Sequence, residues 1–577
     1  MLRLISEAFA QLDRARRIPW IDLLLVIGLA GLVFTFFNMG REWTGVHRNT
    51  IAIDLSPTAL PRYTMFSLFR GLLAYVISLT FTLVYGYWAA KDRIAGRVLL
   101  PLLDILQSIP VLGFMPGLIL ALVALFPNSN IGLELAAVIM IFTGQAWNMT
   151  FSFVHSLRSV PADLREVATV YRFSWWQRLR NVELPFSTMG LVWNSMMSMA
   201  GGWFFLMINE SFQLGHRDFR LPGIGSYMSV AVEQGRGDAM ILAIVAMAGM
   251  IVLLDQLLWR PVVVWAQKFR VEEGGEQIQM TSWFLDWLRT SRIVRAIRSF
   301  ARRTREHLAR PHEPHPVPAP AAALAPARGS VPLSILALGM LVVILGWGTW
   351  KLVHLLQQVP AGTWASATGA GFLTLGRVLV STAIGTLWAL PAGLAIGLSS
   401  RLSRIFQPVV QIAASFPAPM LFPLVIAGLE WAGVGLGWGS ILLMLLGTQW
   451  YILFNVIAGA MVIPADLQEA ARSYGITGWT RFRTLYFPAV FPYLVTGWVT
   501  AAGGAWNASI VAEYVTFKGH TLRAAGLGSQ ISDAAARADF PHLATAILVM
   551  SLLVVAFNRT VWRWCYRLAE ERFSLSK

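Results

Sequence analysis

Long runs of apolar residues are the feature that most limits how this chain can fold. Examples are residues 21–37 (IDLLLVIGLAGLVFTFF), 240–254 (MILAIVAMAGMIVLL) and 333–350 (LSILALGMLVVILGWGTW). A helix needs about 20 predominantly apolar residues to cross the hydrocarbon core of a bilayer. Only 13% of the residues are charged, about half the fraction that is typical of soluble domains. The sequence therefore predicts an all-α polytopic membrane protein.

The positive charges indicate how the chain is oriented. The formal net charge of +16 would suit a nucleic-acid partner, but the Arg and Lys residues gather in particular loops and are missing from others, such as 126–130 and 430–439. Basic loops are typical of the cytoplasmic side of a membrane. We therefore expect no nucleic-acid partner, and we predict a bacterial inner-membrane protein with both termini in the cytoplasm. Cys565 is the single cysteine, which excludes an internal disulfide and a multi-cysteine metal site.

The sequence repeats itself about halfway along. GIGS at 223–226 returns as GLGS at 526–529, and Glu210 returns as Glu513, each 303 positions later. We count about six spans in each half, and an even number returns both halves to the same side, so the repeats are parallel. The predicted domains are a first repeat (1–265), a linker (266–331) and a second repeat (332–577). The expected spans lie near 20–38, 69–90, 98–126, 131–157, 187–208, 239–264, 332–354, 370–399, 405–429, 438–460, 490–513 and 541–562.

The linker has two parts of different composition. Residues 283–300 place Trp283, Trp287, Val294, Ile297 and Phe300 at roughly helical spacing among arginines. Such a basic amphipathic helix suits the headgroup layer, where arginines meet anionic membrane lipid. The Pro/Ala-rich remainder is typical of a semi-extended tether. The alternative is a linker that only joins two fused subunits.

A polar interruption occurs once in each half, at residues 160–185 and 463–488. Pro161 or Pro464 opens a short helix at the position that proline tolerates best. Gly475 allows the second copy to leave its helix in a left-handed conformation. The pattern predicts a bent helical pair that protrudes from the cytoplasmic face of the membrane.

The second interruption reads Glu469-Ala470-Ala471, three residues, Gly475, nine residues and then Leu-Tyr-Phe-Pro, ending at Pro488. It resembles the EAA loop of binding-protein-dependent ABC importer permeases. The phrases SFP, AEYV and GLGS are most similar to the nitrate/sulfonate/taurine group. The first copy keeps the frame, and its matching residues are Glu166, Ala168, Pro185 and, in place of the glycine, Arg172.

The resemblance implies a type I ABC importer permease-like fold and a transport function. It implies that the two loops dock onto two copies of a cytoplasmic ABC ATPase, and that a periplasmic or lipid-anchored substrate-binding protein delivers a small solute. In such loops Ala168 and Ala471 would let the short helices pack, and Glu166 and Glu469 would hold the loop or pair with the ATPase. Because a left-handed non-glycine residue costs about 1 kcal/mol, we expect Arg172 to change the turn or to make the coupling contacts unequal.

The chain contains no nucleotide-binding motif of its own. A Walker A loop needs Gly-Lys before Ser or Thr, and no lysine in this chain follows a glycine. We therefore expect no enzyme activity and no cofactor in this chain, with ATP and Mg²⁺ bound by a separate ATPase. The histidines show no metal-ligand spacing, so no metal site is expected.

Residues at similar positions in both halves are candidates for the transport pathway. Prolines 110, 116, 417 and 423 should break the third and ninth spans. Small residues in membrane helices also permit close packing, and that alternative remains open for the glycine pairs. The pathway candidates are Gln145, Trp147, Gly201, Gly202, Gln449, Trp450, Gly503 and Gly504.

Glu210 and Glu513 are expected near the outer interface, at the far end of the fifth span of each half. They are either solvated or capped carboxylates, or they contact an outer gate or a substrate-binding protein. The sequence identifies no basic residue deep in the spans. The alternative function is an ion-coupled secondary transporter that uses these two acids.

Overall fold

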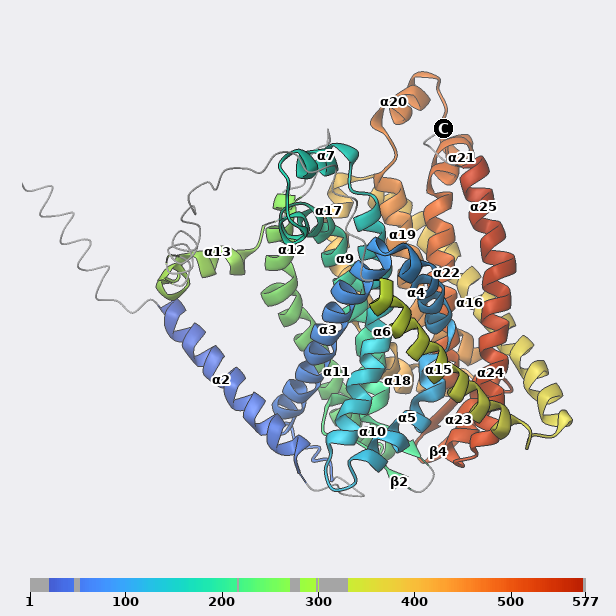
Figure 1. The fold of residues 1–577 in the computed structure, drawn as a ribbon. Helices are drawn as coiled ribbons and strands as arrows, with labels where there is room; N and C mark the ends of the chain where they lie inside the picture. The colour runs from blue at the N-terminus through green and yellow to red at the C-terminus, as the bar shows by residue number, and fades with distance from the viewer. Residues whose placement is uncertain are drawn as a thin grey trace, which may run out of the picture. The chain divides into compact units, whose positions relative to one another are not determined.

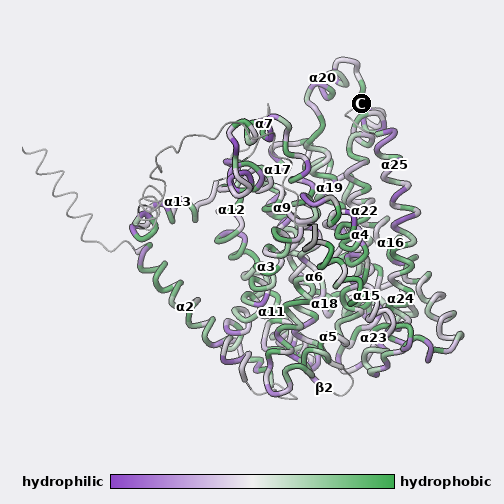
Figure 2. The backbone as a smooth tube through the Cα atoms, in the orientation of Figure 1, coloured by the Kyte–Doolittle hydropathy of each residue, from purple (hydrophilic) through white to green (hydrophobic). Residues whose placement is uncertain are grey.

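The chain is described here from a computed structural model, which covers residues 20–45, 52–214, 217–269, 281–296, 299 and 331–573. The Pro/Ala-rich part of the predicted linker, Ile297 and Phe300 lie outside these residues. Within them, ten helices are long and apolar enough to cross a membrane, or up to twelve if each of two bent pairs is one span. These helices appear as long, mostly green segments in Figure 2. The prediction of an all-α polytopic protein with about six spans per half is confirmed.

The described residues fall into two compact units. One comprises residues up to Gly45, Val160–Trp193 and Val252–Val331, and the other comprises Val46–Ser159, Asn194–Ile251 and Pro332–Lys577. Helix α9 (Leu184–Glu210) passes from the first to the second.

The larger unit holds most of both sequence repeats (Figure 1). From the first repeat it contains α3 (Leu60–Lys91), α4 (Arg93–Ser108), α5 (Val111–Leu125), α6 (Ile131–Arg158), the end of α9, β1 (Gln213–Leu214), β2 (Arg217–Asp218), α10 (Ile224–Glu233) and α11 (Gly237–Leu254). From the second it contains α15 (Val331–Leu356, from Pro332), α16 (Ala361–Gly397), α17 (Ser400–Ser415), η4 (Ala418–Leu421), α18 (Phe422–Trp431), α19 (Leu436–Met461), α20 (Ala465–Ser473), α21 (Gly478–Arg481), η5 (Phe482–Tyr486), α22 (Phe487–Ala512), β3 (Tyr514–Phe517), β4 (His520–Arg523), α23 (Leu527–Ala536), α24 (Phe540–Phe557), η6 (Asn558–Trp562) and α25 (Arg563–Arg572).

The third and ninth predicted spans are broken rather than continuous. Ile94–Gln107 and Val111–Leu125 meet at 96°, and Ser400–Ser415 and Ala418–Trp431 meet at 81°. Pro110 and Pro417 stand directly at the two breaks with extended backbone. Because proline lacks the N–H that would continue the helical ladder, the chain turns there. Pro116 and Pro423 lie inside or at the start of the following helices and do not make the breaks.

Apolar packing joins the helices within each repeat and also joins the two repeats. In the second repeat, Leu453, Val456 and Val490 are buried where α16, α19 and α22 meet. Leu338 of α15 packs against a cluster in the first repeat that contains Ala89 and Leu99. The backbone N–H of Val111 donates to Asn507 Oδ1 at 2.8 Å, which ties the first bent pair to α22.

The smaller unit contains the first polar loop and the two ends of the first repeat. Its elements are α2 (Trp20–Trp43), α7 (Ala162–Val170), α8 (Trp175–Arg178), η1 (Leu179–Glu183), the start of α9, η2 (Asp255–Trp259), α12 (Arg260–Ala266), η3 (Gln267–Phe269) and α13 (Trp283–Thr290). A short helical stretch, 292–296, follows α13.

Candidate functional site

Each polar loop is a short helix, a tight turn and a second short helix. In the first loop the N–H of Phe173 donates to the carbonyl of Ala168 at 2.9 Å, and in the second Ile476 donates to Ala471 at 2.8 Å. This backward bond, which skips the last residues of the helix, is the one that a left-handed residue after a helix permits. The predicted bent helical pair is therefore present in both copies.

Arg172 adopts the same left-handed backbone as the glycine that it replaces. Its φ is 50°, against 65° for Gly475. The turn therefore does not differ between the loops, and that part of our expectation is wrong. The N–H groups of Tyr171, Arg172 and Phe173 all donate to carbonyls of α7, and these three bonds offset the cost of about 1 kcal/mol for the left-handed arginine. Whether the coupling contacts are unequal stays a prediction.

Each loop buries one alanine and exposes its glutamate. Ala168 is 0% exposed and Ala471 is 7% exposed, whereas Glu166, Glu469 and Ala470 are exposed. The alanine carbonyls accept the bonds that close the turns. A larger side chain at either alanine would push the short helix away from its turn.

Pro185 and Pro488 each lie at the second position of a long helix that follows a π-helical turn. The π-helical turns are η1 and η5. Because proline cannot donate to the helical ladder, a locally widened turn accommodates the missing bond. Each polar loop thus continues directly into a membrane-spanning helix.

Large apolar side chains stand exposed on both loops. Tyr171 is 71% exposed, and Tyr474, 303 positions later, is 83% exposed. Exposed aromatic groups that are rimmed by polar residues mark interaction surfaces. The first loop also exposes Val167, Val170, Trp175 and Trp176, and the second also exposes Leu467 and Trp479.

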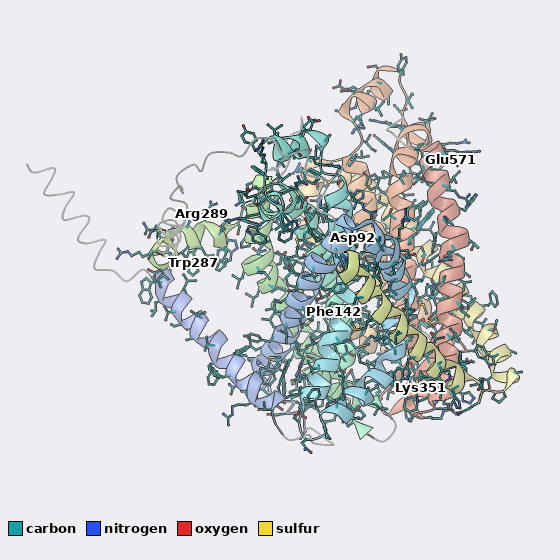
Figure 3. The ribbon with its side chains drawn as sticks, in the orientation of Figure 1. Asp92, Phe142, Trp287, Arg289, Lys351 and Glu571 are labelled. Carbon is teal, nitrogen blue, oxygen red and sulfur yellow. The ribbon has the colours of Figure 1, made fainter. Side chains whose placement is uncertain are left out.

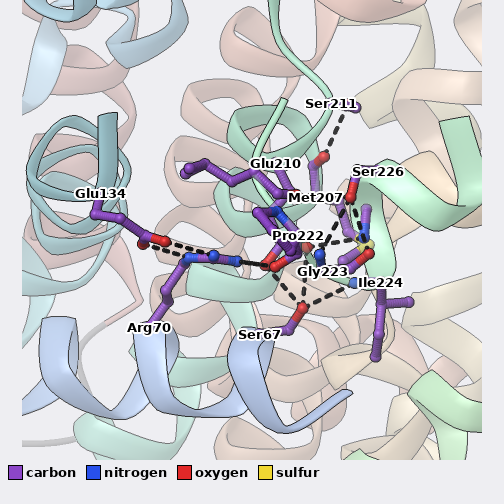
Figure 4. A network of polar contacts seen from close by, with 12 residues as sticks. Ser67, Arg70, Glu134, Met207, Glu210, Ser211, Pro222, Gly223, Ile224 and Ser226 are labelled. Atoms are coloured by element: carbon purple, nitrogen blue, oxygen red, sulfur yellow. Dashed lines mark hydrogen bonds and ion pairs between the residues drawn. The ribbon is translucent and has the colours of Figure 1, made fainter. Parts of the chain in front are cut away.

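Glu210 lies in a buried network of donors at the end of α9 (Figure 4). Arg70 Nη1 donates to its Oε1 at 2.7 Å, Ser67 Oγ donates to the carboxylate at 2.7 and 2.9 Å, and the N–H of Gly225 donates to Oε2 at 2.8 Å. Ser67 and Arg70 come from α3, and Gly225 comes from the first turn of α10. The carboxylate therefore joins three helices, α3, α9 and α10.

Glu513 lies in the corresponding network of the second repeat. Arg377 Nη1 donates to its Oε1 at 2.7 Å, Thr374 Oγ1 donates at 3.0 and 3.1 Å, and the N–H of Gly528 donates to Oε2 at 2.9 Å. The backbone N–H of Leu527 donates to Thr374 Oγ1, just as that of Ile224 donates to Ser67 Oγ in the first repeat. The structure therefore surrounds both acids with matched sets of donors. We call each carboxylate together with its donors a clamp.

The two clamps differ in the group that accepts from the arginine Nε. In the first, Glu134 accepts from Arg70 Nε at 2.5 Å and from Nη2 at 2.7 Å. In the second, Arg377 Nε donates instead to the backbone carbonyl of Gly437, at 3.1 Å. Gly437 stands 303 positions after Glu134, so a carboxylate in one copy is replaced by a main-chain oxygen in the other.

The repeated GIGS and GLGS motifs are explained by these clamps. A Cβ at Gly223 would lie 2.2 Å from the Glu210 carboxylate carbon, and one at Gly526 would lie 2.2 Å from Glu513 Oε2. Only glycine leaves room for a carboxylate to approach the backbone this closely. The motif and the acid, which the sequence presented as separate repeats, form one structural unit.

Sequence reasoning missed the two arginines. Arg70 belongs to α3 and is fully buried, although the sequence identified no basic residue deep in the spans. The signal was present, because Ser67-x-x-Arg70 returns as Thr374-x-x-Arg377. The offset there is 307 rather than 303, which hid the match.

Two of the pathway candidates, Gln145 and Gly202, are direct neighbours. Gln145 is buried and accepts from Ser78 Oγ at 3.2 Å. It also fills the space at Gly202, where a Cβ would lie 2.4 Å from its Nε2. That glycine therefore permits close packing of α6 and α9.

Among the remaining pathway candidates, Gly201 and Gly504 share one neighbour, Tyr451. Gln449 Oε1 accepts from Trp388 Nε1 at 3.0 Å, and Trp450 Nε1 donates to the carbonyl of Leu446 at 3.0 Å. Trp147 packs its ring against Phe81 and Phe142. A Cβ at Gly201 or at Gly504 would meet the Tyr451 side chain, and one at Gly503 would meet nothing.

The repeated spans, the matched clamps and the twin loops define a duplicated, mostly helical membrane protein. Residues 82–258 and 381–572 both match the family described as "Binding-protein-dependent transport system inner membrane component". The matches cover more than half of the chain, which belongs to this family. It is an ABC importer permease, a multi-pass integral membrane protein of a family that implies the bacterial inner membrane.

Curated relatives match this chain over about a third of its length each. The putative aliphatic sulfonates transport permease of Escherichia coli K12 is 29% identical, over 32% of this chain and 71% of its own length. The nitrate import permease of Leptolyngbya laminosa is 27% identical, over 34% and 68%. The taurine transport system permease of Escherichia coli K12 is 25% identical, over 40% and 84%. A duplicated permease would give alignments of this length.

Proposed function

We propose that this chain supplies both membrane subunits of an ATP-driven importer, with the translocation pathway between its two repeats. In this proposal the loops 160–185 and 463–488 each dock onto one copy of a separate cytoplasmic ATPase, which binds ATP and Mg²⁺. The loops would then lie on the cytoplasmic side, as would both termini. Neither the family nor the clamps support an ion-coupled mechanism through Glu210 and Glu513. Each carboxylate already accepts hydrogen bonds from an arginine, a hydroxyl group and a backbone N–H.

The observation that carries the proposal is the matched construction of the loops. Both close with the same backbone bonds, bury one alanine and expose a tyrosine and a tryptophan at corresponding positions, Tyr171 with Trp176 and Tyr474 with Trp479. An exposed, rigid aromatic surface is suited to entering a pocket on a partner at low entropic cost. Because each loop continues directly into a long helix, a displacement of the loop is transmitted to a membrane-spanning helix.

The substrate class is proposed from the relatives alone. Their printed names refer to aliphatic sulfonates, nitrate, taurine and bicarbonate. We propose a small solute of this kind, such as an anion, delivered by a periplasmic or lipid-anchored substrate-binding protein.

The test is to co-express the chain with the ATPase and substrate-binding protein encoded beside it, and to reconstitute the complex in liposomes. The double variant Glu166→Ala/Glu469→Ala should reduce ATP-driven uptake at least tenfold while the chain remains folded. Glu430→Ala, which removes an exposed acid on α18, is the matched control and should leave uptake unchanged. Uptake that continues without ATP would contradict the proposal.

A further inference from the structure

The first part of the segment between the repeats is fixed to the protein at both ends. Residues 281–296 form α13, a break at Ser291 and the helical stretch 292–296. Figure 3 labels Trp287 and Arg289 on α13, close to the start of α2. A passive linker would need neither of the attachments described next.

The first attachment is to α2. Asp22, in the first turn of α2, is 7% exposed, and its Oδ1 accepts from Ser291 Oγ at 2.5 Å and from the N–H of Arg292 at 3.2 Å. Ser291 Oγ in turn accepts from the N–H of Val294 at 3.2 Å. A buried carboxylate that receives the first N–H groups of a helix holds that helix strongly.

The second attachment is to the last span of the first repeat. Trp283 Nε1 donates to Gln256 Oε1 at 3.0 Å, and Gln256 belongs to η2, within the span Gly237–Phe269. Residues 281–296 therefore form a strap that joins the first and last spans of the repeat. Since α2 begins at Trp20, the strap lies at the level where a membrane-spanning helix ends.

The strap has the chemistry of a membrane interface. The Trp283 side chain is 57% exposed, and the ring of Phe284 stacks on that of Trp287 with the ring centroids 5.7 Å apart. Arg289 carries an exposed guanidinium that pairs with Asp286 at 3.0 Å. Aromatic rings beside arginines are the composition that favours the headgroup layer.

Arg295 is held in place beside Arg289. Its Nε donates to the carbonyl of Ser291 at 3.3 Å and its Nη2 donates to the carbonyl of Thr290 at 3.2 Å. These carbonyls end α13, so the guanidinium is fixed at the negative end of that helix. An anion that approaches the strap would meet a cation that is already ordered.

We propose that the strap, residues 281–296, binds anionic phospholipid headgroups through Arg289 and Arg295 and lays its aromatic side chains in the bilayer interface. A basic segment next to a membrane span attracts anionic lipid with about 1 kcal/mol per arginine. The strap would thereby anchor α2, which is mostly exposed along its length. This inference needs only the membrane setting and does not rest on the proposed coupling to an ATPase.

The first experiment measures lipid retention by the full chain. The protein is purified from mixed phosphatidylcholine and phosphatidylglycerol nanodiscs, and bound phosphatidylglycerol is counted by native mass spectrometry. Arg289→Gln/Arg295→Gln should weaken retention about fivefold for each arginine, and added salt should reduce the difference. Arg523→Gln/Arg537→Gln removes two exposed charges that face Asp533 and is the matched control.

Retention that is unchanged in the strap variant, or lost equally in the control, would overturn the proposal. A second measurement places the strap in depth without relying on stability. In a Cys565→Ser background, spin labels at Phe284→Cys and Thr290→Cys report access to oxygen and to a water-soluble nickel complex, and both sites leave the two attachments intact. We expect more oxygen and less nickel contact at residue 284 than at 290. Equal nickel access at both sites would show a strap in water or under a protein partner, and would also overturn it.

Discussion

At the scale of single residues, the strongest demands on this sequence come from two buried acids. Glu210 and Glu513 each accept from an arginine, a hydroxyl group and a backbone N–H. Burying a charge costs several kcal/mol unless partners surround it. The arginines and glycines around these acids are therefore required by the acids themselves.

Removing Arg70 should strongly destabilise the protein. Arg70→Ala leaves Glu134 and Glu210 buried without their cation, and we expect a loss of about 3–5 kcal/mol. Thermal unfolding of the detergent-purified chain measures this loss. Arg236→Ala, which breaks an exposed pair with Asp238, should change the melting temperature little, because exposed ion pairs contribute little to stability. Equal shifts for the two variants would contradict the account of the clamp.

A methyl group at Gly223 should disturb the same clamp. In Gly223→Ala the new Cβ would overlap the Glu210 carboxylate, and overpacking of this kind costs about 1–3 kcal/mol. Gly237→Ala is the control, because its Cβ would meet only Met240 Cε at 4.0 Å. If both alanines lower the melting temperature equally, the glycine in GIGS is not a requirement of the clamp.

At the scale of elements, the sequence predicted the parts that depend on local chemistry. Proline at 110 and 417 placed the breaks, and the loop frame with Gly475 placed the turn. The hairpin β1–β2 and helix α10 were not predicted. Helix α10 is positioned by the bond from the Gly225 N–H to the Glu210 carboxylate and by the bond from the Ile224 N–H to Ser67, which lies 157 residues away in sequence. The effect of Arg172 was predicted from the low intrinsic preference of arginine for the left-handed region. The backbone bonds of the turn override that preference.

The two turns should respond oppositely to substitution. Arg172→Gly relieves a left-handed arginine and should stabilise the protein by up to about 1 kcal/mol, whereas Gly475→Ala should cost about as much. Denaturation of each variant beside the parent measures the sign. A loss of stability in Arg172→Gly would show that the arginine side chain holds the turn.

At the scale of the whole molecule, the two repeats have matched clamps that contain different numbers of carboxylates. The first carries two carboxylates around Arg70, and the second carries one around Arg377, whose side chain is 14% exposed. We therefore expect Arg377→Ala to destabilise the protein less than Arg70→Ala, by at least about 1 kcal/mol. Thermal unfolding of both variants checks this, and the reverse order would contradict it.

The central claim is that the two loops each dock one ATPase, and native mass spectrometry of the purified complex tests it most directly. Tyr171→Asp and Tyr474→Asp change matched side chains that are 71% and 83% exposed, so the fold should be unaffected. The account predicts two ATPase copies on the parent chain, one on each single variant and none on the double variant. Two copies that remain bound to the double variant would contradict it.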